Sequence, residues 1–190
     1  MKMPIIAYGD PVLKKVAEVI TQEYDQLTTL IENMFETMYA ANGVGLAAPQ
    51  IGLPIRLFVI DATPFFEDKT KITGLKKVFI NASISDEKGE KWIFNEGCLS
   101  IPDVREDVSR HPDIFISYYD ENWNFHEESF NGLLARVIQH EYDHIEGKLF
   151  TDRINPLRKT MLRGKLDAIT KGLIKVDYKM RFPLSKKRRN

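Results

Sequence analysis

The segment that most constrains this chain is a His-Glu-x-x-His pattern at residues 140–144. Apolar residues recur with helical spacing across residues 132–147, so we expect one amphipathic helix there. Residues four apart lie on one face of an α-helix, and His140 and His144 can therefore offer imidazole nitrogens to a single metal ion. Glu141 would lie beside them, where a carboxylate can take a proton from a water activated by the metal. The segment predicts a metal-dependent hydrolase with its site at the edge of the core.

The overall composition is that of one globular domain without a strong net charge. Among the 190 residues, 27 basic residues balance 27 acidic ones, so the chain as a whole has no electrostatic signature for nucleic acid or an acidic membrane. Hydrophobic residues make up 43% and charged residues 28%, which argues against extensive disorder. No segment resembles a transmembrane span or a secretory signal. We therefore expect a cytoplasmic protein with a single domain over residues 1–184 and a basic tail over residues 185–190.

Periodicity along the chain predicts an α+β fold. The first segment, up to Ala17, is expected to be a loop with a turn, followed by a helix over residues 25–41. A last helix is expected from Pro156 to about Thr170. The intervening sequence predicts strands at residues 55–61, 78–81, 91–94, 104–108 and 113–119, and a polar loop over 63–74. These strands lie too close together for crossover helices, so we expect mixed, mainly antiparallel sheets around the His-Glu-x-x-His helix, together with an N-terminal and a C-terminal helix.

Two histidines make an incomplete catalytic metal site, which normally has three protein ligands and one open position. In one class of peptidase the third ligand is a downstream glutamate, but no glutamate follows Glu146. In another class it is a histidine six residues after the second one, and this chain has Phe150 there. Two other histidines remain: His111 precedes a proline, and His126 lies among acidic residues near a turn. We expect both to be exposed.

The single cysteine, Cys98, is the better third ligand. One cysteine cannot form an intramolecular disulfide, so the thiol is free for other chemistry. Its thiolate binds zinc or ferrous iron well beside two imidazoles, and Gly97 lets the backbone pass close to the metal. A His-Glu-x-x-His pattern alone can arise by chance, but chance does not explain it together with Cys98 in a Gly-Cys-Leu-Ser turn. We predict a metal site formed by Cys98, His140 and His144.

A run of small residues over 43–50 (Gly-Val-Gly-Leu-Ala-Ala-Pro-Gln) follows the helix predicted at 25–41. Small side chains let a backbone approach a ligand closely, and exposed peptide groups can hydrogen-bond an extended substrate. A tight connection between a helix and a strand is the simpler alternative. A dinucleotide site is disfavoured, because these glycines follow a helix and precede a strand, the reverse of the order that such a site requires.

With these three motifs the chain resembles the peptide deformylases, and its long C-terminal helix resembles that of the bacterial type I enzymes. The motifs are residues 43–50, Glu96-Gly97-Cys98-Leu99-Ser100, and Gln139-His140-Glu141-Tyr142-Asp143-His144, in the order found in the family. The resemblance extends over essentially the whole chain, and three spaced motifs are highly specific. The Thr63–Lys77 loop and the basic tail depart most from the family pattern.

The resemblance implies a hydrolase that removes the formyl group from the N-terminal formyl-methionine of newly synthesised proteins and releases formate. It implies Fe2+ as the metal, with Zn2+, Ni2+ or Co2+ as substitutes, held by Cys98, His140 and His144. Glu141 would take the proton of water and return it to the departing amine. The side-chain amide of Gln50 and the backbone N–H of Leu99 match the family's donors to the charged formyl oxygen.

The methionine side chain would need an apolar pocket. Leu133 and Val137 precede His140 on the same face of the predicted helix, and Gly45 would pair its backbone with that of the substrate. The proposed walls of the pocket are Val44, Phe94, Leu133 and Val137. Arg136 is expected to be a solvated or salt-bridged residue at the rim. Glu96 is expected to anchor the cysteine loop by pairing with Arg110.

Partners and alternatives follow from the same residues. The expected partners are N-formyl-methionyl nascent polypeptides, and no membrane. The tail at Ser185–Asn190 contains four basic residues and no acidic one, so it is either a solvated terminus or a contact with the ribosome surface. A zinc metallopeptidase using the same helix is the alternative enzyme. A structural metal domain would need a closed shell of four ligands, and the sequence offers three.

Overall fold

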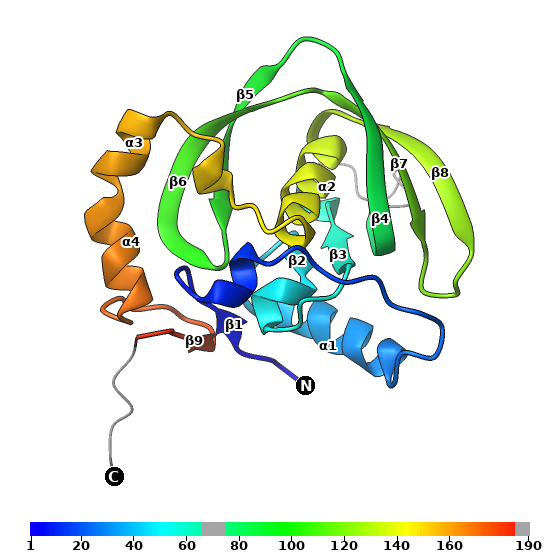
Figure 1. The fold of residues 1–190 in the computed structure, drawn as a ribbon, viewed down its shortest axis with the longest axis horizontal. Helices are drawn as coiled ribbons and strands as arrows, with labels where there is room; N and C mark the ends of the chain where they lie inside the picture. The colour runs from blue at the N-terminus through cyan, green and yellow to red at the C-terminus, as the bar shows by residue number, and fades with distance from the viewer. Residues whose placement is uncertain (66–74, 185–190) are drawn as a thin grey trace.

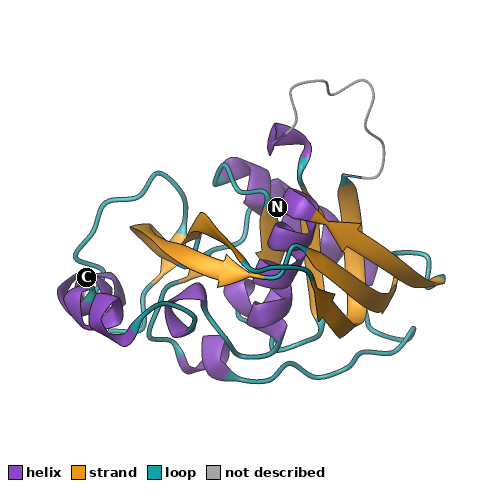
Figure 2. Ribbon diagram, turned by 90° about the horizontal axis from the view of Figure 1, so that it is seen from above, coloured by secondary structure: helices purple, strands orange, loops and turns teal. Residues whose placement is uncertain are grey.

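The computed structural model describes residues 1–65 and 75–184, and its helices and strands are drawn in Figures 1 and 2. The described helices are α1 (Leu27–Ala40), α2 (Gly132–Ile145), α3 (Pro156–Met161) and α4 (Arg163–Thr170), with 3-10 turns η1 (Pro11–Lys14), η2 (Ala48–Ile51), η3 (Thr63–Phe65) and η4 (Phe150–Asp152). The strands are β1 (Ile5–Ile6), β2 (Gly45–Ala47), β3 (Leu57–Asp61), β4 (Lys76–Lys88), β5 (Trp92–Cys98), β6 (Ile101–Arg110), β7 (Asp113–Tyr119), β8 (Phe125–Asn131) and β9 (Met180–Arg181). Most of the predicted polar loop at 63–74 and the whole basic tail lie outside the described residues.

The α2 helix lies at the centre of the molecule, between the β5–β6 hairpin and a larger sheet (Figure 1). That sheet has the order β2-β3-β4-β7-β8, and every neighbouring pair in it is antiparallel. The apolar face of α2 packs Ala135, Ile138 and Ile145 against the sheet, where the rings of Phe58 and Phe79 stack with centroids 4.6 Å apart. The prediction of an α+β fold with mainly antiparallel sheets around the His-Glu-x-x-His helix is confirmed.

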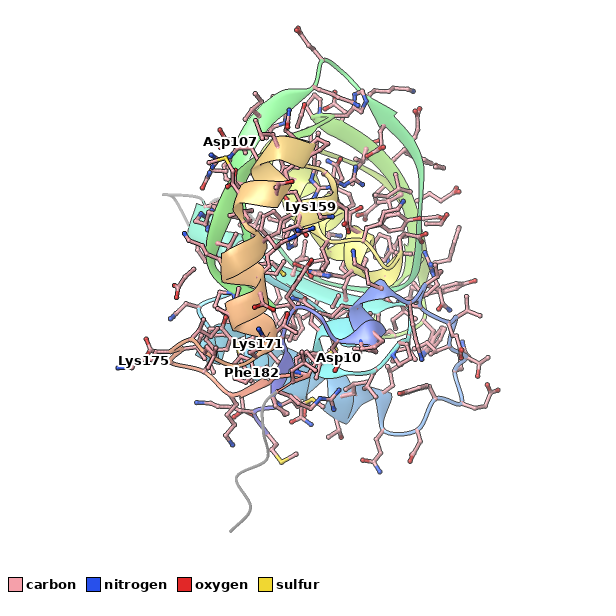
Figure 3. All side chains as sticks on the ribbon, turned by 60° about the vertical axis from the view of Figure 1, so that its left-hand side comes forward. Asp10, Asp107, Lys159, Lys171, Lys175 and Phe182 are labelled. Carbon is pink, nitrogen blue, oxygen red and sulfur yellow. The ribbon has the colours of Figure 1, made fainter. Side chains whose placement is uncertain are left out.

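The β5–β6 hairpin covers the other, polar face of α2. From Val104 to Arg110 in β6, buried and exposed residues alternate, as expected for a strand with one face on the core. The buried side chains include Val104 and Val108, which belong to the same core cluster as Leu166 and Ile169 of α4. In Figure 3 the helices α3 and α4 lie in front of β6. The hairpin turns between Cys98 and Ile101, which face each other in the register, so the cysteine lies where two strands meet.

The predicted helix at 25–41 is confirmed as α1, whereas the predicted helix at 156–170 is divided. The α1 helix ends just before Asn42, whose φ of 54° stops the helical path. The C-terminal segment forms α3 and α4, interrupted at Leu162, where φ is −79° and ψ is −11°. Leu162 is buried with Leu166 and Ile169 beneath β6, so the interruption turns an apolar side chain inward. No helix in the described part of the chain is long and apolar enough to cross a membrane.

A short parallel strand pair joins the two ends of the described chain. Ile5 is aligned with Met180 and Ile6 with Arg181, and the Ile5 N–H donates a hydrogen bond of 2.8 Å to the carbonyl of Lys179. The sequence predicts a loop with a turn in the first segment. The turn is present at residues 8–9, but the segment also forms β1 and η1, which the prediction missed. Pairing between residues so far apart leaves no periodic pattern in the local sequence.

Candidate metal centre

The three side chains predicted as ligands meet between α2 and the β5–β6 hairpin. His140 and His144 project from α2 with ring centroids 5.1 Å apart, and Cys98 is the last residue of β5. The Cys98 Sγ lies 3.3 Å from His144 Nε2. One donor atom from each of the three residues lies within 4.8 Å of the other two. The structure thus brings Cys98 to two histidines that lie 42 and 46 positions later in the sequence, and it offers two imidazoles and one thiol at one point.

This donor set fits a divalent transition metal. Zinc binds thiolate sulfur at about 2.3 Å and imidazole nitrogen at about 2.1 Å, so these donors lie about 3.6 Å apart in a tetrahedral site. The Sγ to Nε2 distance of 3.3 Å is close to that separation. Burial lowers the pKa of His144 well below its usual value, which favours the neutral ring that binds a metal. Cys98 and His140 also line the cavity described below, so the group of ligands is accessible from that side.

The imidazole of His140 is oriented by Glu96 of β5. His140 Nδ1 lies 3.0 Å from Glu96 Oε2, and Arg110 donates to both oxygens of the same carboxylate, through Nε at 2.7 Å and Nη2 at 2.9 Å. Burial alone would raise the pKa of Glu96, but the hydrogen bonds from Arg110 and His140 outweigh it and hold the pKa well below its usual value. The ionised carboxylate accepts a hydrogen bond from the Nδ1–H of His140, so Nε2 of the same ring is left unprotonated for the metal. The predicted pairing of Glu96 with Arg110 is confirmed.

The ion pairs continue from Glu96 into the interior. Arg110 Nη1 donates a hydrogen bond of 2.7 Å to Asp143, and Arg153 pairs with the same Asp143 carboxylate. The side chain of Arg110 is 1% exposed, so its charge must be paired within the protein, and Glu96 and Asp143 supply the two partners. Arg136 is buried and salt-bridged to Glu96, not solvated at a rim. Sequence reasoning missed Asp143 and Arg153, because nothing near either residue indicates its partner.

Glu141 is buried beside β2 with one carboxylate oxygen unengaged. Burial raises the pKa of this carboxyl group to about 7. A Cβ atom at Gly45 would collide with the Glu141 carboxylate, so the glycine allows β2 to pass this close to α2. Within the described part of the chain, Glu141 Oε2 has no hydrogen-bond partner. A free carboxylate oxygen next to the three ligands is placed to exchange a proton with water.

Two of the predicted hydrogen-bond donors lie next to Cys98. The side-chain oxygen of Gln50 accepts a hydrogen bond of 2.9 Å from the Ala47 N–H, and this fixes the direction of the amide. Gln50 Nε2 then lies 3.4 Å from Cys98 Sγ and 3.3 Å from Ser100 Oγ. The N–H of Leu99, the residue after Cys98, forms no hydrogen bond with any other residue that the structure describes. The Leu99 N–H is therefore free beside the ligands, whereas the Gln50 amide donates toward Cys98 Sγ and Ser100 Oγ.

A cavity of about 610 Å³ opens beside these groups. Its lining includes Val44, Gly45, Phe94 and Val137 of the predicted pocket, whereas Leu133 lies outside the lining. The lining also includes Phe65 and the whole segment Lys175–Tyr178, which sequence reasoning missed. That segment follows the last helix and carries no motif, so no local signal could have placed it near Cys98.

The two histidines that were set aside as ligands lie away from this centre. A ring nitrogen of His111 lies 2.7 Å from the carbonyl of Gly89, and His126 Nε2 lies 2.9 Å from Asp120 Oδ2. Both rings are half-buried, not fully exposed as expected, because these hydrogen bonds hold them against the protein surface. Neither belongs to the group of ligand atoms around Cys98.

Comparison with known proteins identifies one family. A sequence model described as Polypeptide deformylase matches residues 2–160. A peptide deformylase of Christiangramia forsetii is 60% identical over 196 aligned positions, which cover 100% of both sequences. Among solved structures, a peptide deformylase from Legionella pneumophila aligns with a TM-score of 0.78 and 40% identity, covering 88% of this chain and 94% of that one. A peptide deformylase from Thermotoga maritima aligns with a TM-score of 0.74 and 39% identity, covering 82% and 99% respectively.

Proposed function

The chain belongs to the peptide deformylase family, and on that premise we propose which of its residues carry out the family's reaction. The reaction is a hydrolysis in which a metal-dependent enzyme removes the N-formyl group from nascent proteins. The proposed metal ligands are Cys98, His140 and His144. The proposed catalytic groups are the Glu141 carboxylate, the Gln50 side-chain amide and the Leu99 N–H.

One observation carries this assignment: three metal-binding side chains converge next to a carboxylate oxygen that has no partner among the described residues. A structural metal site would use four protein ligands and would not need a free base. Here only Cys98, His140 and His144 meet within the described residues, and Cys98, His140 and Glu141 line one cavity. This arrangement supports catalysis over a purely structural role.

The carboxylate of Glu141 would act twice in each turnover. A divalent metal, when bound, would supply a Lewis acid that polarises the formyl group and lowers the pKa of water. The Glu141 carboxylate, which lines the cavity, accepts a proton from water as the water oxygen attacks the formyl carbon. Glu141 then gives this proton to the amide nitrogen as the C–N bond breaks. The products are formate and a free N-terminal amine.

Negative charge develops on the formyl oxygen during the attack, and two donors are placed to meet it. Gln50 Nε2 is held in position by the bond between its own oxygen and Ala47. The Leu99 N–H has no competing acceptor among the described residues. Donors that are already oriented stabilise a developing charge without a reorganisation cost, which lowers the activation barrier.

The cavity would bind the methionine side chain and the peptide backbone that follows it. Val44, Phe94 and Val137 supply apolar surface, and Leu133 remains a predicted wall outside the observed lining. β2 is an edge strand of the large sheet, so Gly45 can offer its backbone to an extended substrate on the side away from β3. The methionine pocket and this edge would together select an extended chain that begins with formyl-methionine.

We propose Fe2+ as the metal, with Zn2+, Ni2+ or Co2+ able to replace it. Two imidazoles and one thiolate accept all four ions, so the donor set alone does not select among them. Metal analysis of anaerobically purified protein, coupled to formate release after reconstitution with each ion, tests this choice. Iron in the purified protein together with the fastest turnover for Fe2+ is the expected result. A zinc-containing protein that iron does not activate would contradict it.

The substrate assignment is tested with two peptides that differ only in the formyl group. The enzyme is expected to release formate from a formyl-Met-peptide and to leave the unformylated twin intact. A zinc metallopeptidase would cleave an internal bond in both peptides and release no formate. Internal cleavage without formate would therefore overturn the proposed chemistry and favour the peptidase.

We further propose that residues 1–184 form one catalytic domain that acts in the cytoplasm on formyl-methionyl nascent chains. The basic residues of the tail at 185–190 would contact the ribosome surface, because clustered positive charge attracts the phosphates of RNA. Co-sedimentation with ribosomes, compared between the full chain and a chain ending at residue 184, tests the tail. Equal binding of both chains at low and physiological salt would contradict this role.

A further inference from the structure

We propose that Tyr178 is a positioning residue for deformylation, because its hydroxyl holds the turn that carries Cys98 and Leu99. The inference rests on the proposed function of this site. Tyr178 Oη donates a hydrogen bond of 2.8 Å to the backbone carbonyl of Leu99. The residue lies C-terminal to residue 160, where the match to the family's sequence model ends.

The chain after α4 returns to the site and forms part of its wall. It turns at Gly172, whose φ is 69° and against which the ring of Phe182 packs. Lys175 and Phe182 mark this returning segment beside α4 in Figure 3. Four consecutive residues of the segment, Lys175–Tyr178, line the same cavity as Cys98 and Glu141. A C-terminal element therefore belongs to the site as well as to the outside of the fold.

Tyr178 is held firmly by the pairing of β9 with β1. The Lys179 carbonyl accepts a hydrogen bond of 2.8 Å from the Ile5 N–H, and the Arg181 carbonyl accepts one of 2.9 Å from the Ala7 N–H. These bonds fix the backbone directly after Tyr178. Its ring is half-buried and packs, as does the Leu99 side chain, against the core cluster that includes α1. The position of the Tyr178 hydroxyl is therefore fixed by this strand pairing and by the packing of its ring.

The turn itself is held by three hydrogen bonds from three distant parts of the chain. Besides Tyr178, the Tyr8 N–H donates to the Ser100 carbonyl at 2.8 Å, and Gln50 Nε2 lies 3.3 Å from Ser100 Oγ. On the Leu99 carbonyl, the hydroxyl of Tyr178 is the only side-chain donor within the described residues. Loss of that hydroxyl would remove this restraint from the Leu99–Ser100 peptide and leave the turn less firmly held.

A loosened turn matters because Leu99 also carries the proposed donor to the formyl oxygen. Its N–H makes no hydrogen bond with other described residues, so its direction depends on how firmly the turn is held. A donor that points slightly away from the formyl oxygen weakens the interaction most in the transition state, where the charge is greatest. The main effect is therefore expected on kcat and not on KM.

The test compares Tyr178→Phe with Tyr118→Phe. Both changes remove one hydroxyl and keep the ring, and the Tyr118 hydroxyl bonds Lys77 and Glu128 on the large sheet, away from the cavity lining. Each variant is loaded with metal to the wild-type level. Tyr178→Phe is expected to lower kcat about tenfold while KM stays within about twofold, a pattern that indicates a lost transition-state interaction. Tyr118→Phe is expected to keep the wild-type kcat.

Amide hydrogen exchange supplies a readout that does not depend on catalysis. In Tyr178→Phe, exchange in the peptide spanning residues 96–104 is expected to become faster, and in Tyr118→Phe it is expected to stay at the wild-type rate. An unchanged kcat in Tyr178→Phe, or an equal fall in both variants, would overturn the proposal. If the wild-type protein released no formate, the proposed function would fail, while unchanged exchange in Tyr178→Phe would separately show that the hydroxyl does not hold the turn.

Discussion

At the residue scale, Glu96 shows how strongly this site depends on groups behind the ligands. Its carboxylate accepts hydrogen bonds from Arg110 and Arg136 and lies within hydrogen-bond distance of His140 Nδ1. The hydrogen bonds from Arg110 and His140 keep the pKa of the buried carboxylate low and the group ionised, and the ionised carboxylate in turn sets the tautomer of His140. Removing one charge from such a buried set leaves its partners buried and unpaired, which strongly destabilises the protein. Because this carboxylate also orients His140, its loss is expected to weaken metal binding.

Glu96→Gln is expected to weaken metal binding about 10–100-fold, the typical cost of losing a group that orients a ligand. The amide keeps the shape of the side chain but turns a donor toward Arg110 or His140. Competition with a chromophoric chelator measures the affinity. Glu106→Gln is the matched control, because Glu106 is also buried and pairs with Arg158 outside the site. Equal affinities for the two variants would contradict the role of Glu96.

Glu141→Gln separates catalysis from metal binding. The change removes the proposed base and keeps the size of the side chain, so formate release is expected to fall at least about 100-fold. Metal content should stay at the wild-type level, because Glu141 is not one of the three proposed ligands. Elemental analysis and a formate assay on the same sample make the comparison. Turnover near the wild-type rate would mean that another group accepts the proton.

At the scale of elements, the close approach of β2 to α2 allows the site to form. Their contact requires a residue without a side chain at position 45, next to Glu141. From a run of small residues the sequence predicted that this backbone could approach a ligand closely, but it did not indicate that Glu141 of α2 would lie opposite Gly45. A local pattern shows that an element can come close to a neighbour, whereas the identity of the neighbour depends on the tertiary fold.

Gly45→Ala is expected to lower kcat at least about tenfold, because displacing Glu141 by even 1 Å moves the base away from its water. Overpacking of this kind should also lower the free energy of unfolding by about 1–3 kcal/mol. Gly164→Ala in α4 is the control, since nothing lies within 4 Å of the added methyl group. The control is expected to retain full activity and to gain about 0.5–1 kcal/mol from its higher helix propensity. Full activity in Gly45→Ala would contradict this prediction, because it would show that the Glu141 carboxylate can be displaced without a loss of kcat.

The elements differ in how far the sequence could predict them. The α1 and α2 helices follow from the spacing of apolar residues, because an amphipathic helix shows its buried face within a few turns. The interruption at Leu162 does not follow, since the segment at 156–170 reads as one helix until the packing beneath β6 is known. In the site, the two histidines and Cys98 could be predicted because their residue types are those of metal ligands. Tyr178 could not be predicted, because its role depends on a tertiary contact with Leu99.

At the scale of the whole molecule, ion pairs join segments that are far apart in the chain. Asp152 in η4 pairs with Lys14 of η1 and, at 2.7 Å, with Lys159 of α3, and it also accepts the Leu149 N–H at 2.9 Å. Burial raises the pKa of Asp152, but the hydrogen bonds from Lys14 and Lys159 have the larger effect and lower the pKa to about 2. The carboxylate thus connects the N-terminal turn with the C-terminal helices.

Asp152→Asn is expected to lower the free energy of unfolding by about 1 kcal/mol at pH 7, the usual range for a partly exposed ion pair. Because the pKa is lower in the folded state, the carboxylate stabilises the fold above its ordinary pKa of 3.8. This contribution is lost as the pH falls from there toward about 2. Urea unfolding of metal-free protein at pH 7 and pH 3 should therefore show a smaller difference between variant and wild type at the lower pH.

Asp167→Asn is the control for this pH dependence. Asp167 forms an exposed pair with Lys171 within α4, and its loss should change stability little at either pH. A difference between Asp152→Asn and wild type that stays constant from pH 7 to pH 3 would contradict the role of the charge. A larger effect for Asp167→Asn than for Asp152→Asn would contradict the importance of joining distant segments.

The pairing of β1 with β9 also affects the order in which the enzyme can mature. Residues 5 and 180 must come together, so this contact has a very large sequence separation and forms late in folding. During translation, β1 leaves the ribosome long before β9 is synthesised and has no partner in the meantime. Tyr178 cannot reach the Leu99 carbonyl until then, so the turn that carries Cys98 is completed only after residue 178 has been translated. A nascent copy of this enzyme would therefore gain full activity only after β9 has been translated and has left the ribosome.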